Sequence, residues 1–514
     1  MNFFGNRAAS GNGNAKQPAI RKVTTQVAVK PGRAVGASST APASPAPASL
    51  PARSRNTERF KLSGSRKQKQ TSTLRHKALD SSSRGVKRKS ATPDVQFSDE
   101  EQDDSSDIGT SDSDASRKRP KSSVSSVETL SASRRCIVPK AAFRNGAPLS
   151  FIHGAHLTSG EYRRKYVNPW EQPDFSTVEL QYPSKRQRES FELKWPLNEN
   201  DDYRPMEDIR DTIETIVKFY YPEDLVRKYT EIEHSYARRF ARAFQLQSIQ
   251  DWIKIVQDFN HELRRLINDG SIERELQAKR GLHLEWIQRI LDQVFVRTVS
   301  PTAESLNKYK SGSDNVYGEL LPPFVSEIFR KVGLTHDHVF VDLGSGVGNV
   351  VLQAALEIGC ESWGIEMMHN PCELADAQAA EFASRTQLWG LDVGEVNFLR
   401  GDMTKHSAVP GLLQRADVVL VNNQAFTPEL NDKLKNMFLD LKEGARIVSL
   451  KPFVPIGHKM AVRNVEDVAN QFVQKQDEYF SNSVSWSHYG NNHWYIATKD
   501  TRPLRAFRKK AGLG

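Results

Sequence analysis

The sequence predicts an α/β protein: a doubly wound, Rossmann-like sheet, preceded by an α-helical domain and by a disordered basic N-terminal arm. Three observations lead to this prediction. A glycine-rich turn joins an apolar strand to an amphipathic helix at residues 339–358. Apolar stripes of helical period fill residues 206–295, and large apolar side chains are sparse in the first third of the chain.

The predicted strand at residues 339–343 has an acid, Asp342, near its end, and the turn at residues 344–349 reads Gly-Ser-Gly-Val-Gly-Asn. Glycines at such a turn let a cofactor lie against the main chain. Asp342 would repel a pyrophosphate but attracts a cationic amine, such as that of S-adenosylmethionine. A lone glycine-rich turn is weak evidence for a cofactor site, so the assignment also depends on the residues that follow the later strands.

Three further apolar stretches are each followed by a polar residue. Glu366 comes about twenty residues after the turn, where an acid can accept hydrogen bonds from ribose hydroxyls. Asp402 follows the stretch 396–399, where a carboxylate can reach an adenine amine. Asn422 follows the stretch 417–421. Four strands ending in this way indicate a ligand site along one edge of the sheet, and they favour a methyltransferase over a dehydrogenase.

The segment before the sheet is predicted to be helical. Apolar stripes run through residues 209–220, 249–267 and 282–294, and Gly270 closes the second. We expect the aromatic residues of these stripes to be core rather than a binding site. The connector at 309–320 precedes the first strand, where it could fold over a cofactor.

The domain boundaries that follow are an arm at 1–140, an irregular aromatic-rich lead-in at 141–205, an α-helical domain at 206–308, a methyltransferase domain at 309–500 and a basic tail at 501–514.

The arm is strongly charged. Residues 1–98 hold 19 Lys and Arg against three acids, residues 99–114 hold eight acids and no base, and residues 115–150 hold eight bases and one acid. A flexible basic arm predicts a polyanion partner, most plausibly nucleic acid. The alternative is a solvated linker without a specific partner.

Other features indicate the compartment. Lys87-Arg88-Lys89 and the cluster at 117–121 resemble nuclear import signals. The chain has three cysteines without metal spacing, which fits a reducing compartment and no metal site. No apolar run approaches the length of a membrane span, and the start lacks a signal-peptide core. We expect a soluble, nuclear protein with no membrane partner.

Five motifs together resemble one known family, the disruptor-of-telomeric-silencing family of non-SET histone lysine methyltransferases, in its fungal type. The likeness spans roughly residues 190–500, and the motifs occur in order at 316–319, 342–349, 421–426, 449–452 and 483–486. It implies a seven-stranded class I methyltransferase sheet that uses S-adenosyl-L-methionine. It also implies methylation of a lysine on the globular core of histone H3 in a nucleosome, with stimulation by ubiquitin on the nucleosome and roles in telomeric silencing and the DNA-damage checkpoint.

The resemblance also assigns residues. The cofactor loop would be Tyr317, Gly318, Glu319 and Leu320, with Asp342 at the methionine amine and Glu366 at the ribose. The remaining cofactor-binding residues would be Phe340, Val341, Leu343, Gly344, Ser345, Gly346, Val347, Gly348, Asn349, Asp402 and Met403. Asn422, Tyr317, Phe426 and Trp494 would form the catalytic lysine channel.

Two positions depart from the family pattern. The family often has Phe where Gln424 stands, which weakens one apolar wall of the channel. A family tyrosine pair falls on His493-Trp494-Tyr495, so either Trp494 or Tyr495 takes that place, and Trp494 as an ordinary core residue is the alternative.

Two other function classes stay open at this point. A nucleic-acid or small-amine methyltransferase of the same fold is one, although the slot after the fourth strand, 422–426, lacks the prolines typical of base-amine methylases. A non-catalytic chromatin-binding module that retains the fold is the other. Binding of S-adenosylmethionine and the identity of the methylated molecule distinguish the three classes.

Overall fold

The computed structural model describes residues 135, 137–138, 143–144, 146–171, 176–198, 203–230, 235–307, 318–480, 483–485 and 492–513. Almost all of the predicted arm lies outside these residues, as do Tyr317 and Trp486. Among the described residues, none of the helices combines the length and the apolar character that crossing a bilayer requires.

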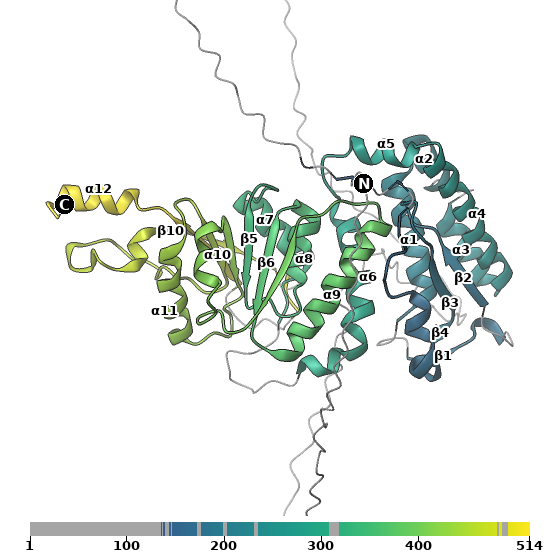
Figure 1. Ribbon diagram of the computed structural model, residues 1–514, viewed down its shortest axis with the longest axis horizontal. Helices are drawn as coiled ribbons and strands as arrows, with labels where there is room; N and C mark the ends of the chain where they lie inside the picture. Colours follow the sequence, from purple (N-terminus) through teal and green to yellow (C-terminus); the bar gives the residue numbers. More distant parts are fainter. Residues whose placement is uncertain are drawn as a thin grey trace, which may run out of the picture. The chain divides into compact units, whose positions relative to one another are not determined.

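The carboxyl-terminal half contains the predicted sheet, which has seven strands in the order β10-β11-β9-β8-β5-β6-β7 (Figure 1). The five strands from β9 to β7 run parallel, and β11 pairs antiparallel with both β9 and β10. The prediction of a seven-stranded methyltransferase sheet is therefore confirmed. The strands are β5 (Val339–Leu343), β6 (Glu361–Glu366), β7 (Val396–Arg400), β8 (Val418–Val421), β9 (Arg446–Ser449), β10 (Phe472–Glu478) and β11 (His493–Lys499).

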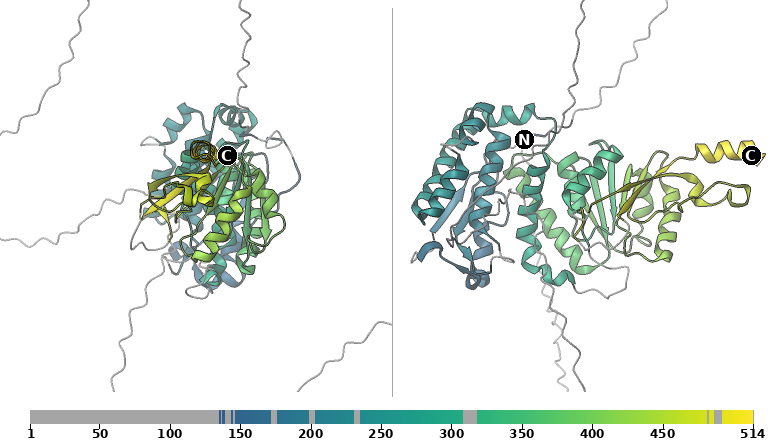
Figure 2. Two further views of the ribbon diagram at one scale, coloured as in Figure 1. Left: turned by 90° about the vertical axis from the view of Figure 1, so that its left-hand side faces the viewer. Right: turned by 180° about the vertical axis from the view of Figure 1, so that it is seen from behind.

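The central strands are buried on both faces, which explains why they read as continuous apolar runs. In β8, Val418 and Leu420 pack into one core with α7 (Pro322–Val332). Val419 and Val421 pack into another core with α10 (Val409–Arg415) and α11 (Pro428–Met437). Helices thus cover both faces of the sheet (Figure 1 and Figure 2). The chain leaves the sheet through α12 (Arg502–Ala511).

The part that precedes the sheet is largely helical, as predicted. Its helices pack around one apolar cluster that includes Trp252, Phe259 and Trp286, so these aromatic residues are core. The helices are α1 (Pro205–Tyr220), α2 (Glu223–Thr230), α3 (Tyr236–Gln245), α4 (Ile249–Asn268), α5 (Ser271–Ala278) and α6 (Leu284–Thr298).

The lead-in was expected to be irregular, and that expectation was wrong. Residues 166–196 contain two short antiparallel strand pairs: β1 (Tyr166–Val167) with β4 (Trp195–Pro196), and β2 (Ser176–Leu180) with β3 (Glu189–Leu193). Alternate residues of β2 and β3 are buried, which is the pattern of a half-buried strand. β2 and β3 have only five residues each. Because they are flanked by proline and aromatic residues, their alternation of buried and exposed positions was not recognised in the sequence.

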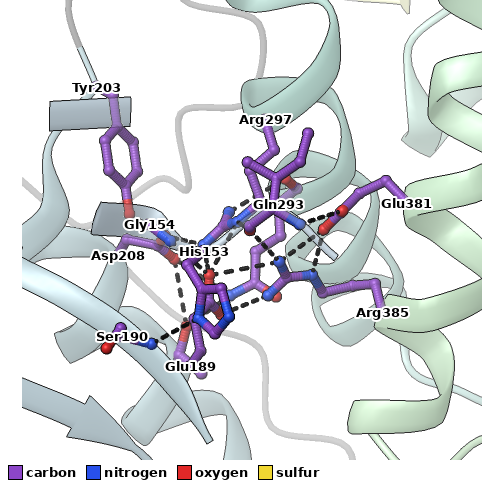
Figure 3. A network of polar contacts seen from close by, with 12 residues as sticks. His153, Gly154, Glu189, Ser190, Tyr203, Asp208, Gln293, Arg297, Glu381 and Arg385 are labelled. Carbon is purple, nitrogen blue, oxygen red and sulfur yellow. Dashed lines mark hydrogen bonds and ion pairs between the residues drawn. The ribbon is translucent and has the colours of Figure 1, made fainter. Parts of the chain in front are cut away.

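A buried polar network joins this N-terminal part to α9 (His369–Leu388) (Figure 3). Glu189 is fully buried, and its carboxylate pairs with Arg297 of α6 and with Arg385 of α9. Asp208 of α1 accepts a second bond from Arg297, at 2.7 Å. Burial alone would raise the pKa of Glu189, but the two arginines hold it below its usual value. The network therefore holds the carboxyl-terminal half of α9, whereas the helix begins at the sheet edge, just after β6.

Candidate active site

The glycine-rich turn follows β5 as predicted and leads into α8 (Asn349–Gln353). The amides of Gly344 and Ser345 both donate to the carbonyl of Ile365 in the neighbouring strand, at 2.9 and 3.0 Å. Gly346 N donates to Glu366 Oε2 at 3.0 Å. The turn is thus held to the end of β6 by its own main chain.

Glycine is required at Gly348 for two reasons. Its φ is +88°, in the left-handed region, and a Cβ there would lie 2.3 Å from Cζ of Phe398. Gly344 also has a φ of +88°, but a Cβ there would make ordinary contacts, 3.6 Å from Met403 Cε and 3.7 Å from Phe426 Cζ. The predicted residues Met403 and Phe426 therefore both lie over the start of the turn.

Asp342 lies beneath this turn and is 4% exposed. Burial, and then the carboxylate of Glu366, raise the pKa of Asp342 to about 8. No donor or cation among the described residues reaches its carboxylate. A buried acid that lacks a structural partner in a ligand site is suited to receive the positive charge of a ligand.

Glu366 ends β6, and its carboxylate organises the local main chain. Oε1 accepts from the amides of Met367 and Met368, both at 2.8 Å, while Oε2 accepts from Gly346. The side chain is half-buried, so its orientation is fixed before any ligand arrives. The structure brings Glu366, Asp342 and the turn together, as the sequence predicted.

Asp402 lies after β7, next along the same sheet edge. Its Oδ1 accepts from the amide and the hydroxyl of Thr404, at 2.8 and 2.7 Å, and Lys405 pairs with Oδ2 at 2.8 Å. The bond from Lys405 contributes most to lowering the pKa of Asp402 to about 2. Asp402 is therefore an ionised acceptor at neutral pH.

Asn422 follows β8 and faces the cofactor loop. Its Nδ2 donates to the carbonyl of Gly318 at 3.1 Å. Its Oδ1 is buried and accepts no hydrogen bond within the described part of the chain. Gln424 is exposed, so it adds no wall to the site, whereas Phe426 is half-buried against the turn.

The cofactor loop is held in place by the 483–485 motif. Leu320 and Val484 form an antiparallel bridge, and Ser485 N donates to the carbonyl of Glu319 at 2.9 Å. The amide of Glu319 in turn donates to Ser485 Oγ at 2.9 Å. Asn349 Nδ2 reaches Glu319 Oε1 at 3.1 Å, so loop and glycine turn are joined directly.

Trp494 is fully buried in the core that α7 forms with the sheet, where it contacts Phe324 edge to face. This environment favours the core interpretation of Trp494. Tyr495 points to the opposite face of β11 and lines a separate cavity of about 390 Å³ beside residues 454–460. Phe340, Val341 and Leu343 are also fully buried, so they support the site from the core.

Sequence reasoning missed the role of Asn423. This side chain is fully buried, and its Oδ1 accepts from the amides of Leu450 and Lys451 at 2.9 and 2.8 Å. Its Nδ2 donates to Asn431. Asn423 thus ties the loop after β8 to the loop after β9, and only the position of a second Asn beside Asn422 hinted at this.

Three observations test whether the site fits S-adenosylmethionine. Among the described residues, no cation pairs with the carboxylate of Asp342 and no donor reaches the buried Oδ1 of Asn422. The third observation is that Gly344 presents main chain without a side chain beside Met403 and Phe426. A cationic amine and hydroxyl donors would satisfy these groups. The residues present therefore fit this cofactor.

The chain is similar in sequence to known proteins. Residues 295–499 match the family described as histone methylation protein DOT1. The chain is 46% identical over 425 residues to the "Histone-lysine N-methyltransferase, H3 lysine-79 specific" of Aspergillus fumigatus, and the match covers 82% of either chain. It is 48% identical over 360 residues to the protein of that name from Emericella nidulans, covering 70% of this chain and 72% of that one. Among solved structures, the tRNA (m1A58) methyltransferase TrmI of Aquifex aeolicus is 18% identical with a TM-score of 0.25, over 39% of this chain and 76% of that one.

Proposed function

The chain belongs to the DOT1 family of histone-lysine N-methyltransferases, and on that premise we propose that the site around Asp342 methylates lysine 79 of histone H3. The enzyme is S-adenosylmethionine-dependent, and its substrate is a histone. The observation that supports the assignment of the site most strongly is the buried carboxylate of Asp342, which lies under the glycine turn and pairs with no cation among the described residues.

In this proposal the cofactor supplies a methyl group on a positively charged sulfur, which is already activated for transfer. Asp342 holds the cationic amine, Glu366 accepts from the ribose hydroxyls, and Asp402 borders the adenine beside Met403. Because Glu366 and the turn are fixed by main-chain bonds, these groups need little rearrangement on binding. The protein therefore contributes mainly alignment.

The substrate lysine must reach the site without its proton, because an ammonium has no lone pair to attack the methyl group. Its pKa in water is about 10.4, and apolar surroundings lower the pKa of an amine. We assign this surrounding to Phe426 and to Tyr317, of which Tyr317 lies outside the described residues. Asn422 Oδ1 is the acceptor that would orient the amine.

Further proposals concern the substrate's context. We propose that the enzyme acts in the nucleus on whole nucleosomes, with the basic arm in contact with DNA phosphates. The charge of residues 1–98 supports this, since it exceeds the net charge of the whole chain. Preference for a ubiquitinated nucleosome, telomeric silencing and the checkpoint role remain predictions from the family resemblance.

The test is methyl transfer from labelled S-adenosylmethionine to intact nucleosomes, free histones and naked DNA. We expect label on histone H3 in nucleosomes, and its loss in a Gly346→Arg variant, whose side chain would fill the cofactor turn. A histone H3 with arginine at position 79 should remain unlabelled. Label on nucleic acid would instead identify a base methyltransferase, and absence of label everywhere would identify a non-catalytic module.

A further inference from the structure

Gln378 is a buried amide that lies outside every motif of the sequence. It belongs to α9, which packs beside α8 at the end of the glycine turn (Figure 1). Its side chain is 1% exposed. Nε2 donates to the carbonyl of Val347 at 2.6 Å and to Oδ1 of Asn349 at 3.1 Å. Both hydrogens of this amide are therefore donated, one to the glycine turn at Val347 and one to Asn349, the first residue of α8.

The bond to Val347 determines which atom donates and which accepts in the bonds from Gln378 to Asn349 and from Asn349 to Glu319. A main-chain carbonyl can only accept, so Gln378 must present its nitrogen there. A flip of the amide would place Gln378 Oε1 against that carbonyl oxygen. The same nitrogen then requires an acceptor from Asn349, so Asn349 Oδ1 faces Gln378 and Asn349 Nδ2 faces away.

Asn349 Nδ2 points to the cofactor loop, where it donates to Glu319 Oε1 at 3.1 Å. Glu319 is 8% exposed, and its main chain is bonded to Ser485 on both sides. The orientation of one amide on α9 is thus transmitted through Asn349 to a carboxylate on the opposite side of the turn. Had Asn349 been free to flip, its oxygen would face that carboxylate and repel it.

We propose that Gln378 is a positioning residue for the cofactor: it orients Asn349, and through Asn349 it holds Glu319 against the glycine turn. The proposal rests on the cofactor pocket assigned above. Gln378 itself touches no ligand in this scheme. Its effect appears in the affinity for the cofactor, because the bonds of Gln378 go to Val347 and Asn349, whereas Asn422 and Phe426 are the groups proposed for the lysine side of the site.

The experiment uses the full-length chain and S-adenosylhomocysteine as the probe. Gln378→Leu keeps the volume and removes both donors. We expect its dissociation constant to rise about tenfold, because a buried carbonyl and a partly buried amide oxygen lose their donor. We expect KM for S-adenosylmethionine to rise in parallel and kcat on nucleosomes to change less than twofold. Gln387→Leu is the matched control, since Gln387 Nε2 donates to Ala383 within the same helix; it should leave both constants unchanged.

A double-variant cycle separates positioning from a loss of stability. In an Asn349→Ala background, Gln378→Leu should weaken binding less than it does in the native chain, because the side chain that Gln378 orients is absent and only the bond to the Val347 carbonyl remains to be lost. Equal losses in both backgrounds, or an unchanged dissociation constant in the single variant, would overturn the proposal. So would a fall in kcat with constant KM. If the native chain itself failed to bind the probe, the proposed cofactor pocket would be wrong, which is a different result.

Discussion

At the scale of single residues, Asp342 combines two properties that oppose each other. Burial of an unpaired carboxylate makes the cofactor-free protein less stable when the group ionises. The same isolation makes the carboxylate a strong partner for a ligand's ammonium, since little water competes for it. A site of this kind therefore lowers the stability of the cofactor-free protein and raises its affinity for a cationic ligand.

Asp342→Asn should change both the affinity for the ligand and the stability of the cofactor-free protein. Because the free protein holds Asp342 with a pKa of about 8, binding of a cationic ligand displaces a proton below that pH. Affinity for S-adenosylhomocysteine should therefore rise from about pH 6 to about pH 8 and then level off. The variant should bind at least about tenfold more weakly at the upper pH, with a flat profile. Isothermal titration calorimetry across this range measures both.

The stability of the cofactor-free protein gives the second readout. The carboxyl of Asp342 keeps its proton in the folded state up to about pH 8, while the unfolded chain loses it near its usual pKa of about 4. Stability from this group is therefore lost as the pH rises through that interval. Asp342→Asn should unfold at a higher temperature than the native protein at pH 8. A lower unfolding temperature would show that Asp342 has a structural partner.

A second residue-scale prediction concerns Gly348. Gly348→Ala forces a Cβ into a left-handed backbone and into the ring of Phe398. Gly444→Ala is the matched control, because Gly444 has a φ of +84° with no atom within 4 Å of the added carbon. We expect about 1 kcal/mol of destabilisation in the control and about 1–3 kcal/mol more at Gly348. Urea unfolding gives both values, and equal losses would mean that Phe398 simply moves aside.

At the scale of elements, α9 links the N-terminal part to the proposed cofactor site. Its carboxyl-terminal half carries Glu381 and Arg385, which enter the buried network around Glu189 (Figure 3). Its middle carries Gln378, which contacts the glycine turn, and its start follows Glu366 directly. The helix is therefore bonded at both ends to groups that leave it little freedom to shift.

Arg385→Met should be strongly destabilising. It leaves Glu189 and Glu381 buried with one partner fewer, and breaking a buried pair in this way costs about 3–5 kcal/mol. Arg227→Met removes an exposed partner of Glu223 and should cost under about 1 kcal/mol. Denaturant unfolding of the two variants compares them. Equal costs would mean that water or a local shift replaces the lost cation in the core.

At the scale of the whole molecule, three described residues of the predicted arm, Arg135, Ile137 and Val138, pack against the folded part of the chain. Arg135 donates to the carbonyls of Leu356 and Glu357, and Ile137 is 3% exposed. The folded part thus begins before the boundary at 140 that the composition indicated. A deletion that ends before Arg135 removes the arm without disturbing this packing.

Deletion of residues 1–134 should weaken binding to nucleosomes and leave affinity for S-adenosylhomocysteine unchanged. The loss should be largest at low salt, because the arm acts through phosphate contacts that release counterions. Nucleosome affinity measured over a salt series should show a shallower slope for the deletion. An unchanged affinity at low salt would mean that the arm is a solvated linker.

Local patterns were enough to predict the four strands β5 to β8, the glycine turn and the acids at the strand ends, whereas the seven-stranded sheet was implied by the family resemblance. The apolar runs of β5 and β8 are typical of strands buried on both faces, and three glycines within residues 344–348 indicate the turn. The contact with Phe398 that disfavours a side chain at Gly348 was found only in the structure. The period of 3.6 likewise located α1, α4 and α6. The short strands β2 and β3 escaped detection because five residues carry too little alternation.

Which polar groups lie together could be learned only from the folded chain. Gln378 and Asn349 are 29 residues apart, and Asn349 and Glu319 are 30 apart, so no local pattern links them. The burial of Trp494 and Asn423 could not be predicted from the sequence either, since burial depends on which elements pack against a residue. Hydrogen bonds between distant segments have no sequence period, and for that physical reason they had to be seen in the folded chain.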